Sequence, residues 1–247
     1  MTTRTCTSPA SAIARSTLLL ALLAGSAHAA AAAAAVTVSP ARDVAEAGLV
    51  DIRTLAPAIE QDIRYAGVDN FTGRRVPGYD APKCYLVAPA ATALAQVEAD
   101  LRAEGFALRL FDCYRPAHAV KAFVAWAHDP HEQSRKALQY PDIDKPALLG
   151  GYIAETSGHS RAATVDLTLL DCRTGPCAPM DMGTDFDFFG PRAHTDAPEI
   201  SEVQRRHRQQ LRQAMARRGF ANYPMEWWHF TLRPEPAPTT AYDVPVR

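Results

Sequence analysis

Hydrophobic residues recur at helical spacing in three stretches of the chain. The first stretch, residues 89–105, carries an apolar stripe and ends at a glycine, which is typical of helix C-termini. The second begins at Pro116, which suits the first turn of a helix, and presents apolar residues on one face. The third runs from about Pro198 to Arg218 and is stopped by Gly219. The pattern therefore predicts three long helices.

Four other stretches have the alternation or the short apolar run that is typical of strands. They are residues 51–66, 106–112, 162–170 and 227–233. Loops rich in glycine, proline or polar residues are expected at 69–83, 128–150 and 180–190. Because strands and helices alternate irregularly, with loops that suit hairpins, we expect an α+β single domain. Its central sheet should be mainly antiparallel and flanked by helices.

The N-terminal region has the layout of an export signal. Residues 1–42 contain no Asp or Glu, and Arg4 and Arg15 precede an apolar run followed by small residues. We therefore expect a signal peptide at residues 1–29 that is cleaved after Ala29. The apolar run is shorter than the roughly 20 residues that cross a bilayer, so no membrane span is expected. An uncleaved anchor and a wrongly assigned start site are the alternatives.

Beyond the signal, we expect an alanine-rich linker at residues 30–40 and one domain at residues 41–247. The signal predicts an exported, periplasmic protein. A chain of 247 residues that is 47% hydrophobic and 21% charged suits a well-packed domain. Its formal charge of −1 and pI of about 6.7 provide no basic surface to neutralise phosphates. The composition therefore argues against a nucleic-acid partner.

Four cysteines lie beyond the expected signal, and Cys6 lies within it. An even number of cysteines in an exported chain favours disulfides. The segment CRTGPC has a Gly-Pro turn between Cys172 and Cys177, so this pair can close a short loop and leave Cys84 to pair with Cys113. Four cysteines allow three pairings. Zinc binding by Cys172 and Cys177 is the alternative, although no second pair of thiols supports it.

A candidate site lies in SGHSRAATVDLTL, residues 157–169. In the expected strand, Asp166 shares a face with two threonines, opposite the aliphatic residues. His159 precedes Asp166 by seven residues, up to roughly 25 Å in an extended chain. The two side chains can therefore meet only if the chain turns back at Ser160 and Arg161. By itself, a His–Asp pair is more often a structural hydrogen bond.

The segment EWWHF, residues 226–230, changes this interpretation. A catalytic zinc site needs three protein ligands, an open position for water and a carboxylate that takes the proton from that water. His159, Asp166 and His229 supply suitable ligands, and Glu226 supplies the base. The two tryptophans can provide an apolar wall that strengthens charge interactions, although core packing explains at least one of them equally well.

These segments resemble the zinc-dependent D-alanyl-D-alanine dipeptidases of the VanX type, which are related to D-Ala-D-Ala carboxypeptidases and the hedgehog signalling domain. The resemblance covers nearly all of residues 41–247. It rests on separated motifs in the same order: DIRYAGVDNFTG, FDCYRP, SGHSRAATVDLTL, FDFFG and EWWHF. It implies that His159, Asp166 and His229 bind one zinc ion per chain and that Glu226 is the general base and acid.

The resemblance implies three further roles. Arg115 of CYRP stabilises the oxyanion, Asp187 of FDFFG holds the substrate ammonium, and Ser157 lines the same pocket. A structural salt bridge is the alternative for Arg115, and a loop cap is the alternative for Asp187. One position departs from the family pattern, because Ala162 follows Arg161 where the family usually has glycine. A turn that requires a positive φ would be strained there by the Cβ atom.

The function that we expect is hydrolysis of the dipeptide D-Ala-D-Ala, or a close analogue, by an exported zinc enzyme. Two alternatives are a carboxypeptidase or endopeptidase that acts on longer cell-wall peptides and a non-catalytic peptidoglycan-binding module. An open cleft would favour the first alternative, whereas Glu226 argues against the second, because a binding module needs no base. The sequence leaves the oligomeric state open.

Overall fold

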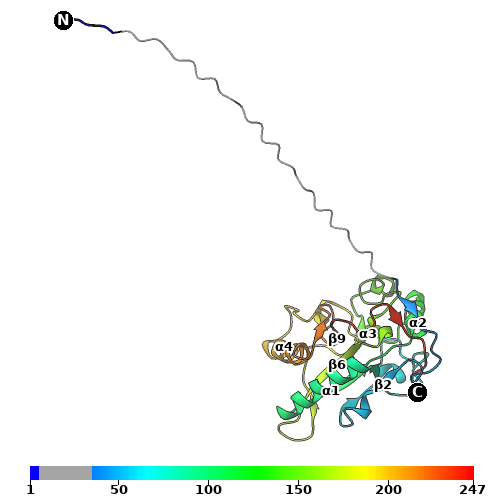
Figure 1. Ribbon diagram of the computed structural model, residues 1–247. Coiled ribbons are helices and arrows are strands. Elements are labelled where there is room, and N and C mark those ends of the chain that lie inside the picture. Colours follow the sequence, from blue (N-terminus) through cyan, green and yellow to red (C-terminus); the bar gives the residue numbers. More distant parts are fainter. Residues whose placement is uncertain (6–34) are drawn as a thin grey trace. The chain divides into compact units, whose positions relative to one another are not determined.

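The computed structural model describes residues 1–5 and 35–247, and the latter belong to one compact unit (Figure 1). Its strands are β1 (Thr37–Val38), β2 (Leu49–Asp51), β3 (Glu60–Gln61), β4 (Tyr85–Val87), β5 (Phe106–Asp112), β6 (Thr164–Asp171), β7 (Ala178–Pro179), β8 (Phe220–Asn222), β9 (His229–Leu232) and β10 (Thr240–Ala241). Its helices are α1 (Ala88–Ala103), α2 (Ala117–His128), α3 (Lys136–Gln139) and α4 (Glu202–Ala216). Short 3₁₀ helices lie at Ile52–Thr54, Arg64–Ala66, Lys145–Leu148, Gly158–Arg161 and Pro191–Ala193.

The central sheet has six strands, in the order β3-β5-β6-β9-β8, and β7 also pairs with β6. Strand β6 is antiparallel to β5, β7 and β9, and β8 is antiparallel to β9. Strand β3, however, is parallel to β5, and the separate pair of β1 and β10 is also parallel. The prediction of an α+β domain is therefore confirmed, and that of a mainly antiparallel sheet is confirmed in part.

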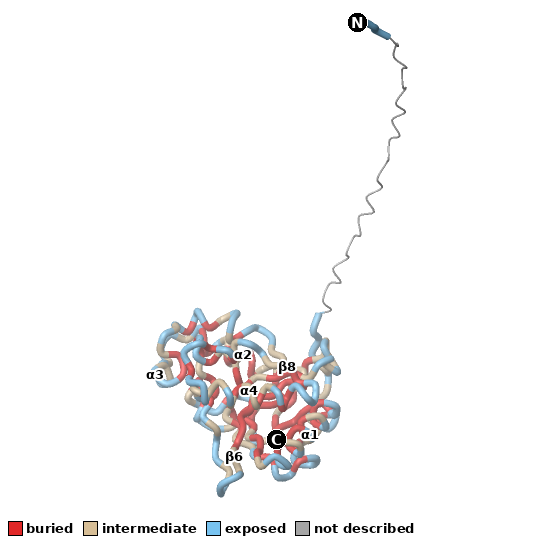
Figure 2. The backbone as a smooth tube through the Cα atoms, turned by 90° about the vertical axis from the view of Figure 1, so that its left-hand side faces the viewer, coloured by how far each residue is buried: buried red, intermediate tan, exposed pale blue. Residues whose placement is uncertain are grey.

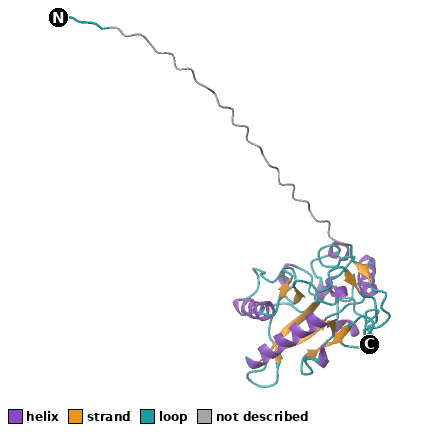
Figure 3. Cartoon of the chain, in the orientation of Figure 1, coloured by secondary structure: helices purple, strands orange, loops and turns teal. Residues whose placement is uncertain are grey.

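Strand β6 explains how the sheet separates the core from the site. Val165, Leu167 and Leu169 on one face are fully buried in the hydrophobic core, which also contains the apolar stripe of α1. Figure 3 shows α1 lying along the strands, and Figure 2 shows that β6 is buried along most of its length. The opposite face carries Asp166, whose partner in the register with β9 is His229. Strand pairing alone thus brings two predicted site residues together.

Most of the predicted elements are present, with different boundaries. Helix α4 begins at Glu202 rather than Pro198, because Ser201 and Gln204 form a capping box that starts the helix. The strand predicted for 227–233 begins only at His229. The strand predicted for 51–66 is wrong: short strands and 3₁₀ helices alternate there, and the Asp51 side chain caps the first of these helices. Apolar spacing alone does not show such a local capping interaction.

The turn at Ala162 has a left-handed backbone conformation, which favours glycine. Ala162 ends the 3₁₀ helix Gly158–Arg161 in the left-handed region, with φ 57°. An L-residue pays roughly 1–2 kcal/mol for this conformation. The methyl group is fully buried, and burying one such group stabilises by about 0.8 kcal/mol. Burial therefore offsets much of the strain, and the chain still turns back between His159 and Asp166.

Both predicted disulfides are present. Cys84 pairs with Cys113, and Cys172 pairs with Cys177. The first is buried, and the second closes a short turn in a loop that is largely exposed. The zinc alternative for Cys172 and Cys177 is therefore wrong, because bonded sulfurs offer no thiolate.

The predicted signal peptide and linker occupy the N-terminal 40 residues. The expected cleavage site at Ala29, Cys6 and most of the signal peptide lie outside the described residues. Thr37 and Val38, at the end of the expected linker, form β1 and pair with β10. Within the part of the chain that the structure describes, no helix combines the length and apolarity needed to cross a membrane.

Candidate metal centre

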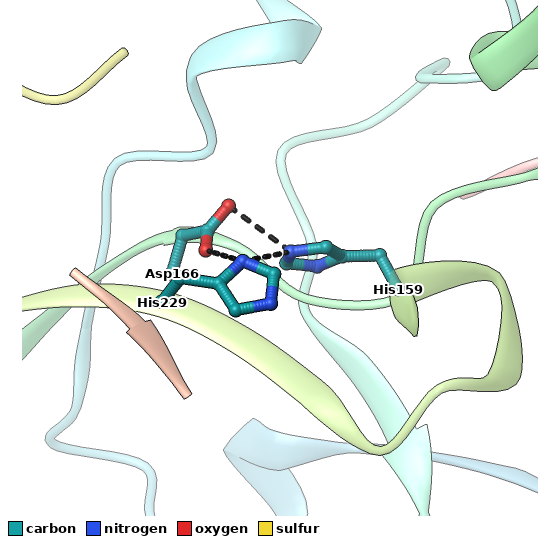
Figure 4. A group of neighbouring side chains, drawn as sticks. All are labelled: His159, Asp166 and His229. Carbon is teal, nitrogen blue, oxygen red and sulfur yellow. Dashed lines mark hydrogen bonds and ion pairs between the residues drawn. The ribbon is translucent and has the colours of Figure 1, made fainter. Parts of the chain in front are cut away.

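His159, Asp166 and His229 converge on one point above the sheet (Figure 4). His159 comes from the 3₁₀ helix Gly158–Arg161, Asp166 from β6 and His229 from the start of β9. One nitrogen or oxygen atom from each side chain lies within 4.8 Å of the others. These three side chains thus offer two imidazole nitrogens and one carboxylate to a single ion.

The spacing of the donor atoms suits a tetrahedral ion. Nε2 of His159 lies 3.3 Å from Nδ1 of His229 and 3.2 Å from Oδ2 of Asp166. Nδ1 of His229 lies 3.1 Å from Oδ1 of Asp166. Ligands bound to zinc at about 2.0–2.1 Å in a tetrahedron are separated by roughly 3.3 Å. These closest separations, two of which involve different oxygens of Asp166, are near the spacing expected around a zinc ion.

The buried oxygen of Asp166 points to the same fit. Oδ1 has no hydrogen bond of acceptable geometry from any of the described residues, despite its distance of 3.1 Å from His229. A buried carboxylate oxygen without a hydrogen bond is costly, and coordination of a cation removes that cost. Two histidines and one carboxylate, with a fourth position left open, are also a common ligand set of catalytic zinc.

The ring of His159 is oriented by a backbone carbonyl. Nδ1 of His159 lies 2.7 Å from the carbonyl oxygen of Cys113. A carbonyl oxygen only accepts hydrogen bonds, so Nδ1 carries a proton, and Nε2 is the ring nitrogen that faces Asp166 and His229 and would bind a metal. This arrangement of a ligand ring and an outer acceptor is typical of histidines that bind metals.

Two acidic groups determine the charge of His229 in the metal-free protein. Burial lowers the pKa of His229, but the carboxylates of Asp166 and Glu226 outweigh burial and raise this pKa to about 9. Burial raises the pKa of Asp166, but the imidazoles of His159 and His229 outweigh burial and hold this pKa below its usual value. Without a metal, His229 is therefore a cation beside an ionised Asp166.

Glu226 lies at the edge of this group. Its Oε2 atom lies 3.3 Å from Nδ1 of His229, and the side chain is 12% exposed. The turn that carries Glu226 is fixed by the bond from Asn222 Nδ2 to the Glu226 carbonyl oxygen, 3.0 Å. Glu226 therefore has a partly solvated carboxylate next to the three candidate ligands, where a general base would have to be.

Arg115 forms a buried ion pair and also lines the cavity beside the metal centre. Its Nη2 atom lies 2.8 Å from Oδ2 of Asp112 and 3.6 Å from Oδ2 of Asp166. Its hydrogen bonds go to one oxygen of Asp112, so several of its five N–H groups remain for another partner. The ion pair that the sequence analysis gave as the alternative is present, and the residue also faces the cavity, whereas its role toward an oxyanion stays a prediction.

Asp187 lines the same cavity and is almost fully buried. Its Oδ1 atom accepts a hydrogen bond of 3.0 Å from the hydroxyl of Tyr65, whereas Oδ2 has no partner among the described residues. Burial, followed by the negative charge of Asp166, raises the pKa of Asp187 well above its usual value. The backbone of Asp187 is also strained, with φ 60°. A buried carboxyl with one free oxygen suits a cationic partner.

The cavity that contains these groups has a volume of about 230 Å³. The segment 150–159 forms one wall, and the hydroxyl of Tyr223 holds this wall by a bond of 3.2 Å to the carbonyl of Gly151. Ser157 lies in this wall, and its Oγ atom accepts a hydrogen bond of 3.2 Å from the backbone of His159. The cavity is smaller than the roughly 300–1,000 Å³ of ordinary ligand pockets, so it suits a small substrate.

Comparisons with known proteins identify the family of this chain. The profile of the D-ala-D-ala dipeptidase family matches residues 45–247. The chain belongs to the D-Ala-D-Ala dipeptidase family. The D-alanyl-D-alanine dipeptidase of Streptomyces coelicolor is 44% identical over 195 residues, which are 78% of this chain and 95% of that protein. The enzyme of the same name from Enterococcus faecium is 37% identical over 203 residues, 82% of this chain and 100% of that protein.

One solved structure has a weaker similarity to this dipeptidase-family chain. The crystal structure of the vancomycin resistance D,D-pentapeptidase VanY in complex with Zn(II) is 16% identical, with a TM-score of 0.37. The similarity covers 63% of this chain and 77% of that one. A score this low supports no statement about the present site.

The structure brings together every site residue that the sequence predicted for this dipeptidase-family chain. Their roles in binding and catalysis stay predictions. The sequence did not predict Asp112, the partner of Arg115, or Tyr65, the partner of Asp187. Asp112 lies within FDCYRP, and Tyr65 lies within DIRYAGVDNFTG, so the motifs contained both. The sequence alone did not indicate which side chains Asp112 and Tyr65 would contact.

Proposed function

We propose that this chain is a zinc metallopeptidase that hydrolyses the dipeptide D-Ala-D-Ala. The observation that carries the proposal is the convergence of two histidines, an aspartate and a neighbouring glutamate in a small cavity. Membership in the D-Ala-D-Ala dipeptidase family supports the choice of substrate. We further propose that each chain holds one zinc ion.

His159, Asp166 and His229 would hold the zinc ion. The ion supplies a Lewis acid that polarises the peptide carbonyl and acidifies a water molecule. The chain contributes the orientation of the ligands, because the Cys113 carbonyl and the β6–β9 register hold them at the observed distances. The buried wall that includes Trp228 keeps other water away from the site.

We propose that Glu226 transfers the proton in both steps of the reaction. Its carboxylate takes a proton from the attacking water and then passes this proton to the leaving amine. A position next to the ligands and partial exposure allow the side chain to reach both groups. A binding module with a structural metal would not need this carboxylate, so Glu226 favours an enzyme.

Arg115 and Asp187 would hold opposite charges of the substrate. The free N–H groups of Arg115 suit the negative charge that develops on the carbonyl oxygen during attack. The free oxygen of Asp187 suits the ammonium group of a dipeptide, which would remove the cost of burying that oxygen. Ser157 contributes to the wall of the same pocket.

The small cavity favours a dipeptidase over a carboxypeptidase or endopeptidase. A longer cell-wall peptide would have to pass Asp187, where its nitrogen is acylated and carries no charge. A cavity of about 230 Å³ with a buried carboxylate at one side suits a dipeptide better than such a chain. Hydrolysis of D-Ala-D-Ala, L-Ala-L-Ala and a pentapeptide that ends in D-Ala-D-Ala, measured side by side, tests this proposal.

Replacing His229 by alanine should remove most of the zinc from the purified protein. The change deletes one of three ligands, and two ligands hold zinc far less tightly. Metal analysis of the purified variant gives the zinc content. His128→Ala is a matched control, because His128 lies exposed at the end of α2 and should keep zinc at the level of the unchanged protein. Full zinc content in the His229→Ala variant would overturn the ligand assignment.

Zinc binding at pH 7 should release about one proton per chain. The pKa of His229 is about 9 in the metal-free protein, so the ring is protonated at pH 7 and must lose that proton to bind a metal. Zinc affinity should therefore rise as the pH increases toward 9. Calorimetric titrations in two buffers with different heats of ionisation measure the released protons. No release at pH 7 would show that His229 is already neutral.

We also propose that the protein is exported to the periplasm. The proposal rests on the basic, apolar and small-residue pattern of residues 1–29. Two disulfides support it, because disulfides persist in oxidising compartments. Fractionation of cells that produce the full chain, followed by sequencing of the N-terminus, tests both the location and cleavage after Ala29.

A further inference from the structure

We propose that the Cys84–Cys113 disulfide positions the zinc site by holding the carbonyl group that orients His159. This inference rests on the proposed zinc-binding function and adds a positioning role for a crosslink between Cys113, which lies within FDCYRP, and Cys84, which lies outside the motifs. Cys113 is the residue whose carbonyl oxygen accepts the hydrogen bond from Nδ1 of His159. The crosslink and the orienting acceptor are thus on the same residue.

The position of Cys113 in the fold explains why a crosslink matters there. β5 ends at Asp112, so Cys113 is the first residue after the strand and lies outside the ladder between β5 and β6. Cys84 directly precedes β4, which pairs with β2 in a separate two-stranded sheet. The disulfide therefore ties the chain that leaves the central sheet to a second sheet.

The residues that follow Cys113 lead directly to the site. The backbone N–H of Tyr114 donates to the carbonyl of Tyr85, 3.0 Å, and that of Arg115 donates to the carbonyl of His159, 3.2 Å. The segment 113–115 is therefore held between β4 on one side and the turn that carries His159 on the other. A shift of Cys113 moves the acceptor of the ligand ring and the start of the Arg115 side chain together.

The expected effect follows from how a ligand histidine is held. If the Cys113 carbonyl is less restrained, the ring of His159 can rotate or place its proton on Nε2, which then offers no lone pair to the metal. Loss of such an outer partner typically lowers metal affinity about 10–100-fold. Removing the disulfide leaves the carbonyl and two backbone hydrogen bonds in place. We therefore expect a loss near the lower limit, about tenfold.

The second disulfide provides a matched control. Cys172 and Cys177 are five positions apart, follow β6 and are partly exposed, and neither residue lines the cavity. The loop that this disulfide closes follows the C-terminal end of β6, whereas His229 pairs with Asp166 near the N-terminal end of that strand. Removal of the crosslink alters that exposed loop. Zinc affinity should therefore remain unchanged in the variant without it.

The experiment compares zinc binding by four full-chain proteins after removal of metal. They are the unchanged protein, Cys84→Ala/Cys113→Ala, Cys172→Ala/Cys177→Ala and Leu101→Ala. Leu101 is fully buried in α1, so its replacement lowers stability without touching the site. Competition with a chelator, at a temperature far below the unfolding transitions of all four, gives each zinc dissociation constant.

We expect a dissociation constant about ten times higher for the Cys84/Cys113 variant and unchanged values for the two controls. Nitrogen-15 spectra of the histidine rings add a readout that is independent of activity: the Nδ1-protonated form of His159 should dominate in the unchanged protein and lose that dominance in this variant. If the double variant does not fold, Cys84→Ala alone removes the crosslink and leaves residue 113 intact.

Each outcome is informative. Equal zinc affinity in the Cys84/Cys113 variant and the unchanged protein would overturn the positioning role while leaving the zinc site in place. An equal loss in the Leu101→Ala variant would show that general stability, rather than the position of Cys113, governs zinc affinity, and would also overturn it. Absence of zinc binding by the unchanged protein would instead overturn the proposed function itself.

Discussion

Glu226→Gln should hydrolyse D-Ala-D-Ala about 10²–10⁴-fold more slowly than the unchanged protein while keeping its zinc. General acid–base catalysis contributes a factor of this size, and an amide cannot accept the proton from water. The amide has nearly the same size and shape as the carboxylate, so the side chain still fits next to His229. Initial rates of D-alanine release, together with metal analysis, measure both effects.

Glu199→Gln is the matched control for this prediction. Glu199 is exposed in the loop before α4 and lies outside the cavity, so the same chemical change should leave the rate unaltered. Near-normal turnover in Glu226→Gln would assign the proton transfer to another group. Loss of zinc together with activity would show that Glu226 supports metal binding instead.

N-acetyl-D-Ala-D-Ala should be a very poor substrate beside D-Ala-D-Ala. Acylation removes the ammonium charge, so the buried Asp187 would be left without a partner for Oδ2. Leaving one member of a buried charge pair unpaired costs on the order of 3–5 kcal/mol, which is an upper limit here, because the raised pKa of Asp187 lets its carboxyl take up a proton when no ammonium is bound. This upper limit corresponds to a factor of up to several thousand in kcat/KM. Measuring kcat/KM for both substrates tests the prediction.

The Asp187→Asn variant should narrow the difference in kcat/KM between D-Ala-D-Ala and N-acetyl-D-Ala-D-Ala, because the substitution slows hydrolysis of the free dipeptide far more than hydrolysis of the acetylated one. Asp185→Asn is the matched control: Asp185 lies two residues earlier on the same loop, is exposed and does not line the cavity. The Asp185→Asn variant should retain the full preference of the unchanged protein for the free dipeptide over the acetylated one. Equal rates on both substrates with the unchanged protein would favour a carboxypeptidase and give Asp187 a structural role.

Together, these two predictions separate the chemistry from the choice of substrate. Glu226 and Asp187 lie on different loops, and only Glu226 is in contact with a candidate ligand. A protein that loses turnover with Glu226→Gln but accepts the acetylated dipeptide would be a zinc peptidase for longer chains. An unchanged protein that hydrolyses neither substrate would fit a binding module.

The sequence by itself determined the elements whose signals are local. Helix α1 and strand β5 were predicted nearly to the residue, because periodic apolar positions and a terminal glycine are properties of the segment alone. The same holds for the disulfide between Cys172 and Cys177, since a short turn connects them. The sequence also determined which chemical groups were available to a metal, as the residue types in the motifs are sufficient for that.

Only the tertiary structure decided which of these groups meet. His159 and His229 are 70 positions apart, and their contact depends on the pairing of β6 with β9 and on the left-handed turn at Ala162. Asp187 meets Tyr65 across 122 positions. Such contacts depend on strand register and on how loops pack over the sheet, and neither is encoded in local spacing. The short strand β8 was missed for the same reason, because its few residues are held extended by their neighbours and not by their own pattern.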